Sequence, residues 1–405
     1  MSSTASERTE KPTHKRRQEA RKRGQVARSN DLTGALLVLA SSFAIPQVCR
    51  FLLETATEGA ARVGSAPEAG LQATLSWWAM RASGGLFAPL AVLALVATVA
   101  LASLLPVRGD AAVVAGLVTN AGIALLFFLY GARLPREAIV AGMAHWRLHL
   151  TVLACTFVLF PLLGFALLPL ARPWLTPELV LGVLFQSALP KPVKSSIDFT
   201  SIAHGNVAAA VCSASLSNLL GVFLTPLLVS LMVATHGGPA SPLEAIGKIA
   251  LLLFAPFVLG HALRPWLAGF VERRRRLLSI TDRGTVLLVV YVAFSASVVE
   301  GLWQRVPPAS LVAVGALAIA LLAIVLLATR FAGRVCGFDR ADTIALVFCG
   351  SKKSLASGVP IAGVLFAGDP VIGVILLPIM LFHPLQLVAC AVLAQHWSHA
   401  EPIER

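Results

Sequence analysis

Charged residues are scarce in this chain. Only 13% of its 405 residues are Asp, Glu, Lys or Arg, whereas 57% are hydrophobic and the mean hydropathy is +0.80. A soluble globular domain carries about 25% charged residues, so this balance excludes that class and favours a polytopic helical membrane protein. Aromatic residues make up only 7% of the chain, and Ala and Leu fill the apolar runs. A membrane β-barrel would instead show hydrophobic and polar residues in alternation along its strands, so these apolar runs argue against that class.

Spacings typical of catalytic and metal sites are also missing. The six cysteines are scattered through apolar segments, and His204, His261 and His383 stand alone, so we interpret them as buried thiols and structural histidines. We find no nucleophile elbow, phosphate-binding glycine loop or zinc motif, and we expect no enzyme activity, cofactor or metal. The first apolar run starts only near Leu32 and lacks a small-residue cleavage site, so no cleavable signal peptide is expected. We attribute the net charge of +13 to the orientation of the protein in the membrane, and we expect no nucleic-acid partner.

One stretch places two lysines side by side within an apolar crossing. Residues 347–360 read VFCGSKKSLASGVP, with apolar runs on both sides. A lysine at the centre of a membrane helix costs about 2.5–3.5 kcal/mol. Neighbours on a regular helix point about 100° apart, so Lys352 and Lys353 cannot share one lipid-avoiding face. With Gly, Ser and Pro around them, the stretch predicts a discontinuous transmembrane helix with a polar site. The alternative is that both lysines snorkel to an interface.

A second polar break lies within residues 178–203. Prolines flank Lys191 on both sides and are expected to break the helix. Lys194 and Asp198 follow at i, i+4 spacing, either as part of a site or as a mutually neutralising pair. Four of the eight lysines of the chain therefore fall in two broken helices.

Hydropathy predicts ten spans, with the breaks in the fourth and the ninth. Each half of five spans then carries a break at the same position, which is typical of the central site of a secondary transporter. Because five is odd, the halves must be inverted. We therefore predict an all-α polytopic membrane protein of two inverted five-helix repeats with two discontinuous crossing helices. The predicted spans are 86–105, 112–132, 149–171, 178–203, 206–234, 242–264, 282–303, 309–330, 341–366 and 370–395. The predicted regions are a basic N-terminal segment at 1–30, a marginal apolar or interfacial segment at 31–85, a transporter domain at 86–396 and a tail at 397–405.

Loop charge predicts the orientation. Loops on one side of the ten spans carry 13 Arg residues against three on the other, so the first span begins in the cytoplasm and both termini are expected there. Residues 1–28 hold nine Lys or Arg and three Glu, and are expected on the same face against anionic lipid. One extra span at 32–53 would invert the rest. We therefore expect that segment to be interfacial or re-entrant, or to return as a hairpin with 71–83.

Motifs in order across residues 86–396 resemble a known transporter family. They include IALLFFLYGARL at 123–134, GNVAAAVCSASLSNLLGVFLTPLL at 205–228 and VFCGSKKSLASGVPIAGVLF at 347–366. These stretches are similar to the bile acid:sodium symporter-like superfamily, specifically its bacterial SBF-like branch. The resemblance implies a panel domain and a core domain, two broken helices that cross at mid-membrane, alternating access, and a place in the bacterial inner membrane.

Both breaks depart from that family. In sodium-coupled members, as the resemblance implies, the ninth-span break carries a Glu and a Gln that coordinate sodium, and here Phe348 and Lys352 occupy those positions. A fixed ammonium near the place of the ion repels Na⁺ and can substitute for its charge, which puts sodium coupling in doubt. Close relatives carry Thr, Gln and Ala where this chain has Pro192, Lys194 and Asp198, and these changes alter the specificity or damage the site.

The candidate site combines cations with small polar residues. Its net ionic charge is positive, and half-helix N-termini add partial positive charge, so we predict secondary transport of a small organic anion. The small polar residues are alternatively packing contacts between helices. The candidate substrate- or ion-binding residues are Lys191, Lys194, Ser195, Ser196, Asp198, Thr200, Asn206, Ser213, Ser217, Asn218, Gly350, Ser351, Lys352, Lys353 and Ser354.

Proton coupling is the hypothesis that the lysine pair suggests. No carboxylate lies in the break of Lys352 and Lys353, and Asp198 is the nearest acid if the two breaks cross. A lysine that closes on this acid in one conformation, and exchanges its proton in the other, would couple transport to protons without sodium.

Residues 1–55 carry a second resemblance. The run ERTEKPTHKRRQEARKRGQVARSNDLTGALL is similar to the N-terminus of the type III secretion and flagellar export-apparatus switch family. The self-cleaving Asn-Pro-Thr-His site of that family is absent, because KPTH at 11–14 lacks the Asn. Two alternatives follow: an export-apparatus component that acts through its N-terminal segment, or a fusion or misassigned start with an inert segment. The sequence does not define the oligomeric state.

Overall fold

The computed structural model describes residues 87–133, 145–234 and 250–399, and every regular element within these ranges is a helix. The segments predicted at 1–30 and 31–85 lie outside the described residues, and so does the tail from residue 400. The last helix continues to His399, three residues beyond the predicted end of the transporter domain. The longer helices are α4 (Phe87–Leu104), α5 (Asp110–Arg133), α11 (Val207–Ala234), α15 (Arg275–Val299), α17 (Pro308–Val335) and α20 (Ile372–His399).

Within the described residues, six helical stretches are long and apolar enough to cross a membrane, and a seventh is reached if one bent pair counts as a span. That pair joins the stretch Leu252–Ala262 to α14 (Arg264–Arg273) with a bend of 65°. The prediction of an all-α multi-pass membrane protein is therefore confirmed. The count of ten inverted spans stays a prediction, because several of the predicted spans consist of short helices.

Both predicted breaks are present. The first separates α9 (Pro177–Ala188) from α10 (Val193–Ile202), and the second separates α18 (Arg340–Gly350) from α19 (Leu355–Leu365). Pro190 and Pro192 lack the N–H groups that would continue α9. At the second break, the Ser354 hydroxyl accepts a hydrogen bond from the backbone N–H of Ser357 at 3.1 Å and caps α19. The two breaks touch, since the N–H of Ser354 donates to the Pro190 carbonyl at 2.8 Å.

A third irregularity was not predicted from the sequence. The third predicted span is α7 (Trp146–Ala154) and α8 (Phe160–Ala171), joined by the π-helical turn η1 (Cys155–Leu159). In this turn the N–H of Phe160 bonds to the Cys155 carbonyl. The next residue, Pro161, has no N–H to offer. The carbonyl of Thr156 is therefore left without a backbone donor, at the depth of the two breaks.

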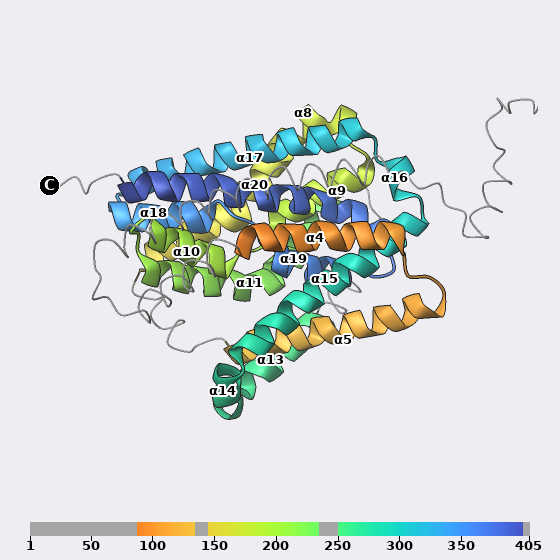
Figure 1. Ribbon diagram of the computed structural model, residues 1–405. Coiled ribbons are helices and arrows are strands. Elements are labelled where there is room, and N and C mark those ends of the chain that lie inside the picture. The colour runs from red at the N-terminus through yellow and green to blue at the C-terminus, as the bar shows by residue number, and fades with distance from the viewer. Residues whose placement is uncertain (1–86, 134–144, 235–249, 400–405) are drawn as a thin grey trace, which may run out of the picture.

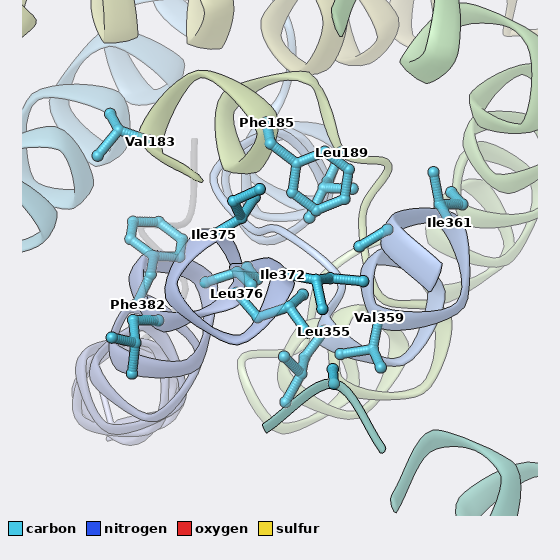
Figure 2. Packing of buried hydrophobic residues seen from close by; sticks show 14 of the residues in the cluster. Val183, Phe185, Leu189, Leu355, Val359, Ile361, Ile372, Ile375, Leu376 and Phe382 are labelled. Atoms are coloured by element: carbon cyan, nitrogen blue, oxygen red, sulfur yellow. The ribbon is translucent and has the colours of Figure 1, made fainter. Parts of the chain in front are cut away.

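The helices pack in two connected groups (Figure 1). In one group α5 packs against α13 (Ala255–Ala262), and α15 packs against both α4 and α5. The other group contains both broken segments together with α8, α11, α17 and α20, and α15 contacts it through α19 and α20. The apolar cluster beside the breaks draws on α9, α19 and α20 (Figure 2). Its labelled members are Val183, Phe185, Leu189, Leu355, Val359, Ile361, Ile372, Ile375, Leu376 and Phe382.

Two glycines allow α5 and α13 to touch backbone to backbone. A Cβ atom on Gly260 would overlap the carbonyl of Phe128, and one on Gly131 would overlap the carbonyl of Phe257. Close approach through small residues is a common means of helix association in membranes.

We predict that Gly260→Ala lowers the free energy of unfolding by about 1–3 kcal/mol, because the added methyl group must push two backbones apart. Thermal unfolding of the purified protein in detergent, followed by tryptophan fluorescence, measures the change. Gly116→Ala on α5 is the matched control, since a Cβ there meets nothing within 4 Å. An equal transition temperature for the two variants would show that this contact is not tight.

Candidate functional site at the two helix breaks

Lys353 joins the first break to the π turn. Its ammonium donates hydrogen bonds to the carbonyls of Leu189 and Thr156, each at 2.7 Å, and lies 4.3 Å from the centroid of the Phe160 ring. The side chain is completely buried. Backbone carbonyls of unwound helices are the groups that coordinate alkali cations in transporters. The ammonium is therefore a covalently attached cation in a site of that kind.

Lys352 is held in a similar way on the other side of the crossing. Its ammonium donates to the carbonyl of Ser195 at 2.7 Å and lies 4.5 Å from the ring centroid of Phe199 and 5.7 Å from that of Phe348. Cation–π attraction strengthens when the cation is desolvated. The adjacency of the two lysines, which a regular helix could not accommodate, is resolved by the break, since each side chain reaches a different helix.

Side-chain amides satisfy the remaining backbone groups at the breaks. Gln386 on α20 accepts from the N–H of Lys353 at 2.8 Å and donates to its carbonyl at 2.7 Å. Asn218 donates to the Lys191 carbonyl at 3.1 Å and accepts from the Ser357 hydroxyl at 3.0 Å. Asn218 was predicted and Gln386 was not. The available signal was a lone amide in an otherwise apolar span.

Lys191 differs from the other two lysines. It lies between α9 and α10 and is fully buried, yet among the described residues no oxygen accepts a hydrogen bond from its ammonium, and the one candidate acceptor beside it is a thiol. The Cys349 thiol lies beside it, and a thiol is a weak acceptor. The hydroxyls of Ser195 and Ser217 also lack partners among the described residues. A buried ammonium without an acceptor is costly, so this is the cation that a carboxylate would stabilise most.

Several predicted residues have structural contacts. The hydroxyls of Ser196, Thr200 and Ser351 each donate to the carbonyl four residues earlier in their own segment. Gly350 is in close contact, since a Cβ there would lie 3.2 Å from the Cβ of Cys155. These positions support the packing interpretation.

The predicted pairing of Asp198 with Lys352 or Lys353 is not formed in this conformation, and it stays a prediction for another one, since Lys352 is among the charges that act on Asp198. Among the described residues no ion pair joins either ammonium to a carboxylate, because the backbone carbonyls described above occupy both. Asp198 and Lys194 are instead exposed on the surface of α10, and Lys194 is the strongest charge acting on Asp198. The buried cluster therefore consists of three lysines and no acid.

A polar layer below the breaks was predicted only in part: Asn206 and Ser213 were candidate residues, whereas their partners Asp342 and His149 were missed. The ring of His149 on α7 lies 2.6 Å from the Ser213 hydroxyl, and both residues are buried. Nearer the loops, Asn206 donates to the Asp342 carboxylate at 2.7 Å, and His145 lies 4.0 Å from the same carboxylate. The signal was the pair of histidines in HWRLH at 145–149. The described residues hold no group of three His, Cys, Asp or Glu side chains that could bind a metal.

The amino-acid sequence of this chain matches a known protein family. The model of the SBF-like CPA transporter family matches residues 91–399. Uncharacterized protein PA2026 of Pseudomonas aeruginosa is 58% identical over 306 residues, covering 76% of this chain and 92% of the relative. "Putative symporter YfeH" of Escherichia coli K12 is 51% identical with the same coverage. Sodium/bile acid cotransporter 7 of Rattus norvegicus is 28% identical over 68% of this chain and 82% of its own length.

The N-terminal part has its own match. The model of the FlhB HrpN YscU SpaS family matches residues 6–109, which is longer than the 55 residues of the predicted resemblance and overlaps the first model at 91–109. The transporter model covers most of the chain, and more than half of each chain is shared with the two bacterial relatives. The chain therefore belongs to the SBF-like CPA transporter family, whose members are transporters and not enzymes.

Proposed function

We propose that this protein is a secondary transporter of a small organic anion in the inner membrane of a bacterium. The observation that carries the proposal is the buried Lys191 ammonium, which has no oxygen acceptor among the described residues. The hydroxyls of Ser195 and Ser217, also without partners there, can donate to the same anion. A carboxylate or sulfonate would supply the missing acceptor and reduce the cost of the buried charge.

Alternating access follows from the architecture that we propose. Two inverted repeats of five spans would place the two breaks at the crossing point of a core domain, and α4, α5, α13 and α15 would form the panel against which it moves. Their packing in two connected groups supports this division. We propose that the N- and C-terminal ends lie in the cytoplasm, and the excess of Arg in one set of loops supports this by the positive-inside rule.

We further propose that sodium does not drive this transport, although one relative is named a sodium/bile acid cotransporter. The ammonium of Lys353 bonds to two carbonyls of the kind that hold alkali ions, and Lys352 bonds to a third. An external cation would meet both occupied coordination and like-charge repulsion. A proton gradient is the remaining common energy source for the coupling.

The first test is uptake into proteoliposomes of pyruvate, succinate and taurocholate, with either a pH gradient or a sodium gradient imposed. We expect accumulation of at least one anion, driven by the pH gradient alone. Lys191→Met should abolish it, since the acceptor-free cation is lost, whereas Arg172→Met at an exposed position should not. Transport of only cations or neutral solutes would exclude the proposal.

The tethered lysines give a second prediction. Lys352→Met and Lys353→Met keep the bulk of the side chain but remove the cation, so we expect insertion into the membrane with loss of transport. Lys353→Met should also be the less heat-stable of the two, because it leaves two buried carbonyls without a donor, each costing about 1–3 kcal/mol. Membrane fractionation, uptake and thermal unfolding measure the three effects. Uptake that requires sodium and ignores pH would show that the lysines do not replace the ion.

A component of the export apparatus is the second candidate, favoured by the family match at residues 6–109. We rank it lower because that match covers a much smaller part of the chain than the transporter match at 91–399. Deletion of residues 2–60 should leave insertion and anion transport unchanged. Binding of purified export-gate subunits that depends on residues 1–30, together with lack of transport in the full chain, would reverse the ranking.

A further inference from the structure

A cavity opens on the loop side of the polar layer. It has a volume of about 340 Å³ and is lined by residues of the α7 start and of the loop into α18, among them His145, Asp339 and Asp342. Asp342 is largely buried, and one of its carboxylate oxygens faces His145 at 4.0 Å while the other accepts from Asn206. The Asp342 carboxylate therefore lines the cavity and is also hydrogen-bonded to Asn206 inside the protein.

His149 lies between this carboxylate and the breaks. It follows Leu148, which lines the cavity, by one residue, and its ring contacts the Ser213 hydroxyl at 2.6 Å. Lys191, His145 and Asp342 are the charged groups near its ring. Two elements confirm the depth order. The helix α11 runs from Asn206 past Ser213 toward Ser217, and α18 runs from Asp342 to Cys349 beside Lys191.

We propose that His149 and Asp342 form a proton path between the loop-side cavity and Lys191, and that this path couples anion release to proton release. The proposal rests on the proposed function and assigns the coupling proton to Lys191 rather than to the tethered lysine pair. Lys352 and Lys353 are unsuited to the role, because each gives its N–H bonds to backbone carbonyls.

The proton balance is simple. In the loaded state the Lys191 ammonium holds the substrate anion. When the anion leaves toward the cavity, water takes its place; one N–H bond of the ammonium breaks, and through this water one N–H bond forms on the His149 ring. The imidazolium then passes a proton to the Asp342 carboxylate, which releases it to water in the cavity. One proton thus accompanies each anion, and the empty carrier returns with a neutral amine at Lys191.

Several titratable or polar groups of the described residues face the two titrating side chains. Around Lys191 they are the thiols of Cys155 and Cys349 and the Lys352 ammonium. Around His149 they are Ser213 on α11, Asp342 on α18, and His145 at the start of its own helix. Neither the two thiols nor the Lys352 ammonium is among the residues that line the cavity, whereas Asp342 is, and this favours the route through His149 and Asp342.

The test uses proteoliposomes that contain the full chain and the pH dye pyranine, with pyruvate, succinate and taurocholate as probes. His149→Gln keeps a hydrogen-bonding group beside Ser213 but cannot carry a proton, and Asp342→Asn keeps an acceptor for Asn206 without the charge. We expect both to lower pH-driven accumulation and anion-dependent lumenal acidification by at least about tenfold. Anion–anion counterflow, which needs no net proton movement, should stay within about twofold of wild type.

The matched control is His261→Gln, at a partly buried histidine that contacts the Gly131 carbonyl on the other helix group; it should behave as wild type in both assays. Normal pH-driven accumulation in His149→Gln, or an equal loss of counterflow, would refute the path. If His149→Gln does not fold, Asp342→Asn decides by the same two assays. If wild type moves none of the three anions in counterflow either, the proposed function fails and the inference fails with it.

Discussion

Peptide groups that leave a helix inside a membrane protein must find partners without water, and the arrangement at the breaks follows from this constraint. The carbonyl of Leu189 is bonded by Lys353, that of Lys191 by Asn218, and the peptide of Lys353 by Gln386 on both its N–H and its carbonyl. Side chains from other segments thus supply the hydrogen-bond partners for the backbone groups of each break. Neither broken segment could hold its shape alone, which ties α9, α11, α19 and α20 into one unit.

The two breaks could be predicted from the sequence because their causes are local. Proline removes donors at fixed positions, and adjacent lysines in an apolar run cannot face one side of a helix. The backbone group that each partner binds could not be predicted, even for the candidate residue Asn218, because the partners come from distant spans. The π turn at 155–159 is an intermediate case: Pro161 is a local signal, but only the structure shows that it frees the Thr156 carbonyl for Lys353. The exposed position of Asp198 could not be predicted for a related reason, since spacing along a helix does not fix which way its outer face points.

Three lysines of equal intrinsic chemistry therefore take different roles through their surroundings. Two are balanced by carbonyl dipoles and aromatic rings, which makes them permanent members of the fold. They occupy the kind of coordination that a family of cation-coupled transporters would give to an ion. An ion that is part of the chain cannot be released on one side of the membrane, so it can shape the site but cannot store or deliver the energy of a gradient.

On the function that we propose, Lys191 is then the residue at which the energy of a proton gradient could enter. An ammonium that lacks an acceptor can be relieved in two ways, by an anion or by the loss of its proton, and the two exclude each other at one atom. Because linkage is reciprocal, whatever binds the anion more tightly must also hold the proton more tightly. The carrier then has its two low-energy states when it holds both the anion and the Lys191 proton, or neither of them. A carrier that holds only one of the two buries a charge without a partner. Coupling in such a site needs no second binding site, only one buried cation without a partner and a path that returns its proton to water.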